Sequence, residues 1–149
     1  MTYLPLGGSV PVIPGLFDIV HTRNRGAAFG FMANLPDSFR LPFFLTISFF
    51  TLFLITVYFF RLHLHDQKKS VFICLSLVIG GAIGNIWDRI TLGEVIDFLS
   101  FHWHEGYARW ILLGHHFTFK LEWPAFNVAD SAISVAVTWM IVSMLKRGE

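Results

Sequence analysis

The segment LPFFLTISFFTLFLITVYFF, residues 41–60, contains no Asp, Glu, Lys or Arg and is flanked by Arg40 and Arg61. An α-helix rises about 1.5 Å per residue, so a segment of this length matches a hydrocarbon core about 30 Å thick. Two more apolar segments follow, at residues 70–88 and 126–145. We therefore expect an all-α polytopic membrane protein whose three visible spans belong to a helical transmembrane bundle.

The composition supports the same fold class. Of the 149 residues, 54% are hydrophobic and 17% aromatic, and only 14% are charged, whereas about 25% are charged in a soluble globular domain. A soluble domain of this size has too little interior to bury so many apolar side chains, so lipid is the expected solvent. A net charge of +1, without a long run of Lys or Arg, argues against a nucleic-acid partner. The single cysteine, Cys74, permits no intramolecular disulfide.

The distribution of Lys and Arg predicts the orientation of this single membrane domain. The connection at residues 61–69 and the tail at 146–149 are basic, and the positive-inside rule places both in the cytoplasm. Residues 1–40 and 89–125 are then extracytoplasmic. Pro and Gly in residues 1–40 favour loops and short strands there. Three arginines of that region oppose the rule: Arg23, Arg25 and Arg40.

The outer segment at residues 89–125 is rich in tryptophan and histidine. Because Trp prefers the membrane–water interface, a loop folded onto the bilayer surface is the simplest interpretation. A metal site built from its histidines is an alternative, but His-Trp-His and His-His lack supporting Cys or carboxylate spacing. The residues concerned are Trp103, Trp110, Trp123, His102, His104, His115 and His116.

Polar side chains stand near the outer ends of two predicted spans, where ionisable groups are costly unless they have partners or a function. On a helix, Asn85 and Arg89 share a face, and the spacing of Asn127 and Asp130 predicts the same for that pair. Asp97 follows the first pair by a short connection, in the apolar sequence VIDFL. If these faces turn inward, two Asp residues come close together and share a proton, since both cannot ionise cheaply. One then serves as general base and the other as general acid toward a peptide carbonyl.

Simpler interpretations of the same residues stay open. Asp88 and Arg89 fit an ordinary interfacial helix end, with the arginine extending toward the headgroups. Asn127 fits a helix N-cap, and Asp97 fits a loop position. The residues by themselves indicate a buried functional site without specifying its reaction.

Three sequence blocks, in this order, carry a resemblance to a known family. The first is VIPGLF at residues 12–17 with RNRGAAFG at 23–30. The second is GGAIGNIWDR at 80–89, which runs into GEVIDF at 93–98. The third is FNVADSAI at 126–133. These blocks are spread over most of the chain, from residue 12 to residue 133, and it resembles the bacterial lipoprotein signal peptidases, also called signal peptidase II.

The resemblance implies an intramembrane aspartyl endopeptidase of the bacterial cytoplasmic (inner) membrane, with its site toward the outer face. Its substrates would be diacylglyceryl-modified prolipoproteins, from which it removes the signal peptide, and it would need no metal or organic cofactor. The family fold has four transmembrane helices, a small β-containing extracytoplasmic part and a helical flap over the site. The catalytic pair corresponds to Asp97 and Asp130. Residues that match substrate-side or neighbouring positions are Asn24, Gly26, Asn85, Arg89 and Asn127. Besides these lipid-modified precursors, membrane lipids are expected partners, and we expect a monomer.

The chain differs from the family pattern in two respects. The family has a first transmembrane helix before the VIPGLF block, and the residues that precede this block here leave no room for one. The connection between Asp97 and Asp130 is longer than the family leads us to expect, with extra sequence at about residues 105–121. A catalytically impaired or non-enzymatic precursor-binding protein is therefore the alternative. A metal-dependent lipid-headgroup transferase is a third hypothesis, but such a site usually needs more carboxylates close in sequence.

Overall fold

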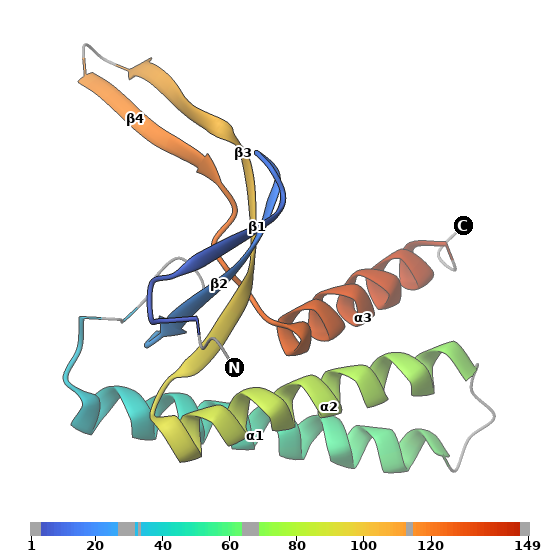
Figure 1. Ribbon diagram of the computed structural model, residues 1–149. Coiled ribbons are helices and arrows are strands. Elements are labelled where there is room, and N and C mark those ends of the chain that lie inside the picture. Colours follow the sequence, from blue (N-terminus) through green and yellow to red (C-terminus); the bar gives the residue numbers. More distant parts are fainter. Residues whose placement is uncertain (1–3, 27–31, 33, 64–68, 113–114, 147–149) are drawn as a thin grey trace. The chain divides into compact units, whose positions relative to one another are not determined.

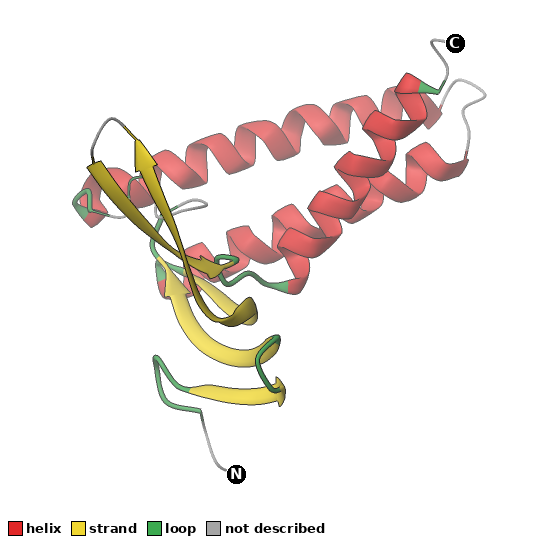
Figure 2. Cartoon of the chain, turned by 90° about the horizontal axis from the view of Figure 1, so that it is seen from above, coloured by secondary structure: helices red, strands yellow, loops and turns green. Residues whose placement is uncertain are grey.

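The structure is a computed structural model that describes residues 4–26, 32, 34–63, 69–112 and 115–146, with the side chains of residues 63 and 103–122 excepted. The chain divides into two compact units (Figures 1 and 2). The strand unit comprises Met1–Asn24 and Ile96–Asn127, and the helix unit comprises Arg25–Val95 and Val128–Glu149.

The strand unit is built on a four-stranded sheet in the order β1-β2-β3-β4. β1 (Ser9–Ile13) and β2 (Phe17–Asn24) form an antiparallel hairpin. Its turn closes with a hydrogen bond of 3.0 Å from the Leu16 N–H to the Ile13 carbonyl. Gly15 has a φ of 75°, and a Pro-Gly pair with positive φ at the glycine is typical of a type II turn.

The second and third helices are connected by strands. α2 (Lys69–Leu92) is followed by β3 (Val95–Leu112) and β4 (His115–Glu122), which form an antiparallel hairpin. The described residues of this connection are therefore mostly paired strands where the sequence predicted a loop, and its position on the bilayer surface stays a prediction. The extra sequence at about residues 105–121 lies within the hairpin, where pairing between strands satisfies backbone hydrogen-bonding groups.

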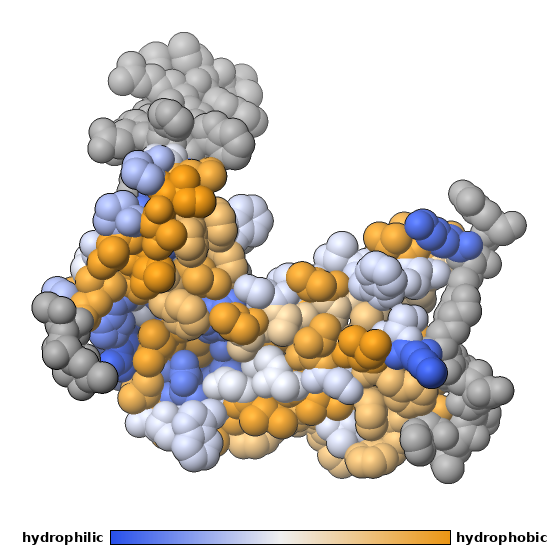
Figure 3. Space-filling model, turned by 45° about the vertical axis from the view of Figure 1, so that its right-hand side comes forward, coloured by the Kyte–Doolittle hydropathy of each residue, from blue (hydrophilic) through white to orange (hydrophobic). Residues whose placement is uncertain are grey.

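The helix unit holds α1 (Asp37–His63), α2 (Lys69–Leu92) and α3 (Val128–Leu145). All three are long and apolar enough to cross a membrane. α1 extends beyond the predicted span at both ends, and α3 begins at Val128 rather than Phe126. Figure 3 shows hydrophobic side chains over much of the visible helical surface. Large apolar side chains more than half exposed include Phe50, Phe53, Phe60, Trp87, Trp139 and Met144. Lipid is the solvent that suits such a surface.

α2 and α3 approach closely at Gly81. A Cβ atom at this position would lie 2.7 Å from the carbonyl oxygen of Ala129 and 2.8 Å from Cγ1 of Ile133. Atoms of a real side chain essentially never come so near, so the absence of a side chain at Gly81 is what permits this approach. A small buried cluster of Cys74, Val78 and Ala136 lies in the same unit.

α2 ends in a glycine cap. Gly93 has a φ of 75°, and its N–H donates to the carbonyl of Arg89 over 3.0 Å. This is the arrangement of an αL cap, which a residue with a Cβ adopts only with strain. β3, which carries Asp97, therefore begins directly after the helix that carries Asn85 and Arg89.

Candidate active site

Asp97 is the third residue of β3, and only 2% of it is exposed. Its Oδ2 accepts a hydrogen bond from Nδ2 of Asn24 at 3.1 Å, and its Oδ1 accepts one from Nδ2 of Asn127 at 3.0 Å. A buried carboxylate is costly unless its oxygens are hydrogen-bonded, and the two amides supply one donor to each oxygen. Three predicted site residues thus form one hydrogen-bonded group in the strand unit.

Further hydrogen bonds hold the backbone on both sides of the group formed by Asn24, Asp97 and Asn127. Thr22 lies two residues before Asn24 in β2, so both side chains lie on one face of the strand, and Oγ1 of Thr22 donates to the Asp97 carbonyl at 3.0 Å. On the other side, an antiparallel bridge pairs Leu99 with Phe126, the residue before Asn127. Thr22 was not among the residues predicted from the sequence, although its alternation with Asn24 in a strand was a usable signal.

Asn127 occupies the position before the first residue of α3. The prediction that Asn127 and Asp130 share a helix face is therefore wrong, because Asn127 precedes the helix, as an N-cap residue does. Besides Asp97, its Nδ2 contacts the carbonyl of Ile96 at 3.4 Å. The side chain therefore contacts the strand at the residue before the carboxylate as well as the carboxylate itself.

Asp130 belongs to the helix unit, where Nδ2 of Asn85 donates to its Oδ1 at 2.7 Å. It stands in the first turn of α3, where the partial positive charge of a helix N-terminus stabilises a negative charge. Asn85 follows Gly81 by one turn on the same face of α2. The close approach at the glycine thus brings the amide within reach of the carboxylate.

Arg89 contacts three parts of the helix unit. Its Nη2 donates to the Gly26 carbonyl at 3.4 Å, and its Nη1 donates to the Asn85 carbonyl at 3.3 Å. Its Cζ lies 5.4 Å from the ring centroid of Phe44, within the range of a cation–π contact. The spacing of Asn85 and Arg89 predicted their shared face, but Phe44 gave no signal because its role depends on α1 packing beside α2.

The predicted site residues thus fall into two groups. Asn24, Asp97 and Asn127 are hydrogen-bonded in the strand unit. In the helix unit, one bond joins Asn85 to Asp130, and Arg89 contacts Gly26. Their catalytic and substrate-binding roles stay predictions.

The histidine-rich segment is only partly described. Nε2 of His102 lies 3.9 Å from Oδ1 of Asp18 in the strand unit, an ion pair only when the histidine is protonated. The other three histidines of the segment have side chains outside the described residues: His104, His115 and His116. The alternative of a metal site there therefore stays a hypothesis.

Comparison with known proteins places the chain in a family. The profile described as signal peptidase (SPase) II matches residues 1–146. A lipoprotein signal peptidase of Geobacter metallireducens is 42% identical over 143 residues, which cover 96% of this chain and 76% of the relative. One from Geobacter sulfurreducens is 46% identical over 138 residues, 93% of this chain and 74% of the relative.

A solved structure shares the fold. It is a bacterial membrane enzyme determined by the in meso method at 1.9 Å, with a TM-score of 0.69 and 31% identity, and the match covers 97% of this chain and 79% of that one. The helices, the sheet and these relatives define a multi-pass membrane protein of the peptidase class. The chain belongs to the signal peptidase II family.

Proposed function

We propose that the chain is an intramembrane aspartyl endopeptidase that removes signal peptides from diacylglyceryl-modified prolipoproteins, with Asp97 and Asp130 as its catalytic pair. The names of its relatives, lipoprotein signal peptidases, support the substrate class. The observation that carries the proposal is the buried Asp97, which accepts an amide donor on each oxygen. Neutral amides orient a carboxyl group without supplying a full positive charge, so it can still exchange a proton.

Asp130 is only partly buried but also accepts a hydrogen bond from an amide. One of its oxygens accepts from the Asn85 amide, and Asn127, which holds Asp97, precedes Asp130 by three residues in the chain. Asn127, which orients the carboxyl of Asp97, and Asp130, which carries the other carboxyl of the proposed pair, are therefore close neighbours in the chain. In this proposal Asn24, Asn127 and Asn85 orient the two carboxyl groups.

The proposed reaction balances with one proton shared by the pair. The ionised Asp takes a proton from water, the water oxygen bonds to the carbonyl carbon, and the protonated Asp gives its proton to the carbonyl oxygen. The resulting gem-diol then collapses with cleavage of the C–N bond. The first Asp passes its proton to the leaving nitrogen, and a hydroxyl of the diol returns a proton to the second Asp. One Asp is then ionised and the other protonated, as at the start of the reaction. In this proposal Gly26 and Arg89 contact the substrate.

The distribution of charge supports an outward-facing site in the bacterial inner membrane. α2 begins at Lys69, beside the basic connection at residues 61–69, and ends beyond Arg89. Asn85 and its partner Asp130 therefore lie toward the end of the helix unit that is remote from this connection. With the basic connection in the cytoplasm, that end faces outward.

The test is the replacement of each carboxyl by an amide of the same shape. We expect Asp97→Asn and Asp130→Asn each to lower cleavage of a lipidated precursor by about a thousandfold or more, because neither carboxyl can perform both proton transfers. The purified full chain is incubated with the precursor, and products are resolved by gel electrophoresis.

Asp88→Asn is the matched control, because Asp88 lies one residue from Arg89 and has no proposed proton-transfer role. We expect it to stay within about threefold of the wild-type rate, as substitutions outside the reacting groups usually have small effects. Near-wild-type processing by either Asp97→Asn or Asp130→Asn would show that these residues are not the catalytic pair.

A further inference from the structure

The guanidinium of Arg89 contacts the ring of Phe44 in addition to making two long hydrogen bonds. Its bonds to the carbonyls of Asn85 and Gly26 measure 3.3 and 3.4 Å, whereas N–H···O bonds usually lie between about 2.7 and 3.2 Å. Bonds of this length orient a donor only weakly. Cζ of Arg89 lies 5.4 Å from the ring centroid of Phe44, and both residues are partly buried. Because desolvation strengthens a cation–π contact, Phe44 is the strongest restraint of these three partners.

The antiparallel packing of α1 and α2 within the helix unit brings Phe44 to Arg89 (Figure 1). Phe44 lies near the start of α1, and Arg89 lies in the last turn of α2. A second pair of side chains joins the opposite ends of the same two helices, where the ring centroids of Phe59 and Phe72 lie 5.6 Å apart. Both contacts follow from one arrangement of the two helices, but only the pair near the start of α1 includes a cation.

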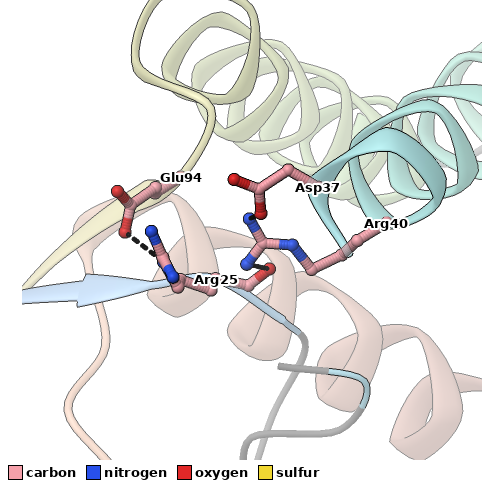
Figure 4. Close-up of polar contacts among 4 residues, drawn as sticks. All are labelled: Arg25, Asp37, Arg40 and Glu94. Atoms are coloured by element: carbon pink, nitrogen blue, oxygen red, sulfur yellow. Dashed lines mark hydrogen bonds and ion pairs between the residues drawn. The ribbon is translucent and has the colours of Figure 1, made fainter. Parts of the chain in front are cut away.

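The face of α1 that carries Phe44 also holds the backbone that Arg89 contacts. Arg40 lies four residues before Phe44, so the two side chains lie on one face of the helix. Nη1 of the buried Arg40 donates to the carbonyl of Arg25 at 2.6 Å (Figure 4). The next carbonyl along the chain, that of Gly26, accepts from Arg89. One face of α1 therefore restrains both the guanidinium of Arg89 and the backbone segment beside it.

We infer that Phe44 is a positioning residue for Arg89 and thereby determines how tightly the chain binds a lipidated precursor. This inference rests on the proposed substrate-side role of Arg89. An aromatic ring suits the purpose because it restrains a guanidinium through its charge rather than through an N–H···O bond. The N–H groups of the guanidinium are then kept for oxygen acceptors such as the carbonyl groups of a peptide. An aliphatic side chain at position 44 would fill space without attracting the cation.

The experiment compares Phe44→Leu and Phe44→Tyr in the full chain, with kcat and KM for a lipidated precursor measured separately. We expect Phe44→Leu to raise KM about fivefold, because the cation–π contact is lost, and to change kcat less than about twofold. Phe44→Tyr keeps an aromatic ring and should restore KM to within about twofold of the wild-type value. An unchanged KM in Phe44→Leu would overturn the inference.

Phe59→Leu is the matched control for a purely structural effect. It is the same substitution in the same helix, it also affects a partly buried residue, and it removes the ring contact with Phe72 on α2. We expect it to lower the unfolding temperature about as much as Phe44→Leu does, while KM stays within about twofold of the wild-type value. If Phe59→Leu raises KM as much as Phe44→Leu, helix packing explains the effect and the inference is wrong.

The decisive arm is a double-mutant cycle with Arg89→Ala. If Phe44 acts through Arg89, the effects on KM are non-additive, and the double variant has about the KM of Arg89→Ala alone. Replacement of Phe44 by trifluorophenylalanine, which weakens the negative charge of the ring face but changes the ring's size little, should raise KM only while Arg89 is present. Additive effects, or a fluorinated ring that leaves KM unchanged, would overturn the inference. Should Phe44→Leu fail to fold, the fluorinated chain decides.

Binding without cleavage separates this inference from the proposed catalytic pair. The same cycle is repeated in the Asp97→Asn background, with the Kd of the lipidated precursor as the measured quantity. Coupling between Phe44 and Arg89 should appear in Kd as it does in KM, because neither residue has a proposed part in proton transfer. Failure of the catalytic pair would appear as rapid cleavage by Asp97→Asn. Failure of the present inference would appear as additive effects on Kd.

Discussion

Gly81→Ala should disrupt the contact between α2 and α3 and, with it, the Asn85–Asp130 hydrogen bond. The added Cβ would lie 2.7 Å from the Ala129 carbonyl oxygen, whereas ordinary contact begins at 3.4 Å. This partner is backbone and cannot rotate away, so the helices must separate by about 0.7 Å. An equal displacement would lengthen the 2.7 Å bond from Asn85 to Asp130 to about 3.4 Å, the limit of a useful hydrogen bond.

The expected cost follows from these displacements. Overpacking a close contact costs about 1–3 kcal/mol, and a weakened hydrogen bond to a charged group adds to this loss. We therefore expect Gly81→Ala to lower the unfolding temperature in detergent by about 3 °C or more. Precursor cleavage should fall about tenfold or more, because Asp130 loses its orienting donor.

Two other glycines of α2 provide graded controls. A Cβ at Gly80 meets nothing within 4 Å, and one at Gly84 lies 3.6 Å from Cβ of Ala129 in ordinary contact. Gly80→Ala should be neutral or stabilising by up to about 1 kcal/mol, since alanine favours a helix, and Gly84→Ala should resemble it. If Gly81→Ala keeps the unfolding temperature and cleavage rate of Gly80→Ala, the reasoning from helix approach is refuted.

Further substitutions test other parts of the site. Arg89→Ala should raise KM more than it lowers kcat in steady-state assays, since Arg89 is proposed to serve the substrate side; a fall in kcat alone would assign it to the chemical step. Asn127→Leu should lower kcat about tenfold or more, because one oxygen of buried Asp97 loses its donor; an unchanged kcat would contradict this. Gly93→Ala should destabilise the fold by about 1–2 kcal/mol, measured by thermal unfolding, because φ there is 75°. Cleavage should persist in EDTA, because amide donors on the oxygens of Asp97 are unsuited to a cation; loss of activity that added metal restores would overturn this.

Local sequence determined the class of this protein. The uncharged run at residues 41–60 predicted a membrane helix because a span requires only length and apolar character, both of which are local properties. The Pro-Gly pair at residues 14–15 likewise marked a turn between short strands. The residue motifs also named Asp97, Asp130 and their Asn neighbours as candidates before any geometry was known.

Local sequence predicted a residue's role less well where that role depends on where a helix or strand begins or ends. The helical spacing of Asn127 and Asp130 predicted a shared helix face, but α3 begins at Val128. Asn127 therefore takes the position before the helix, as in its alternative interpretation as an N-cap, and its amide donates to Asp97. The segment at residues 89–125 was predicted as a loop, but most of its described residues form the long hairpin of β3 and β4. The stability of a strand depends on packing against its cross-strand neighbours, which the aromatic and histidine content of the segment did not reveal.

Only the tertiary structure shows which hydrogen-bond partners the buried polar side chains have. Arg40 and Arg61 flank the same uncharged run at residues 41–60, yet Arg40 is buried against the carbonyl of Arg25 whereas Arg61 is exposed. Gly80 and Gly81 are neighbours of the same type, but only Gly81 faces α3 closely. In both cases the deciding partner is distant in sequence, and the free energy of a buried polar group or a close contact depends on that partner rather than on the residue itself.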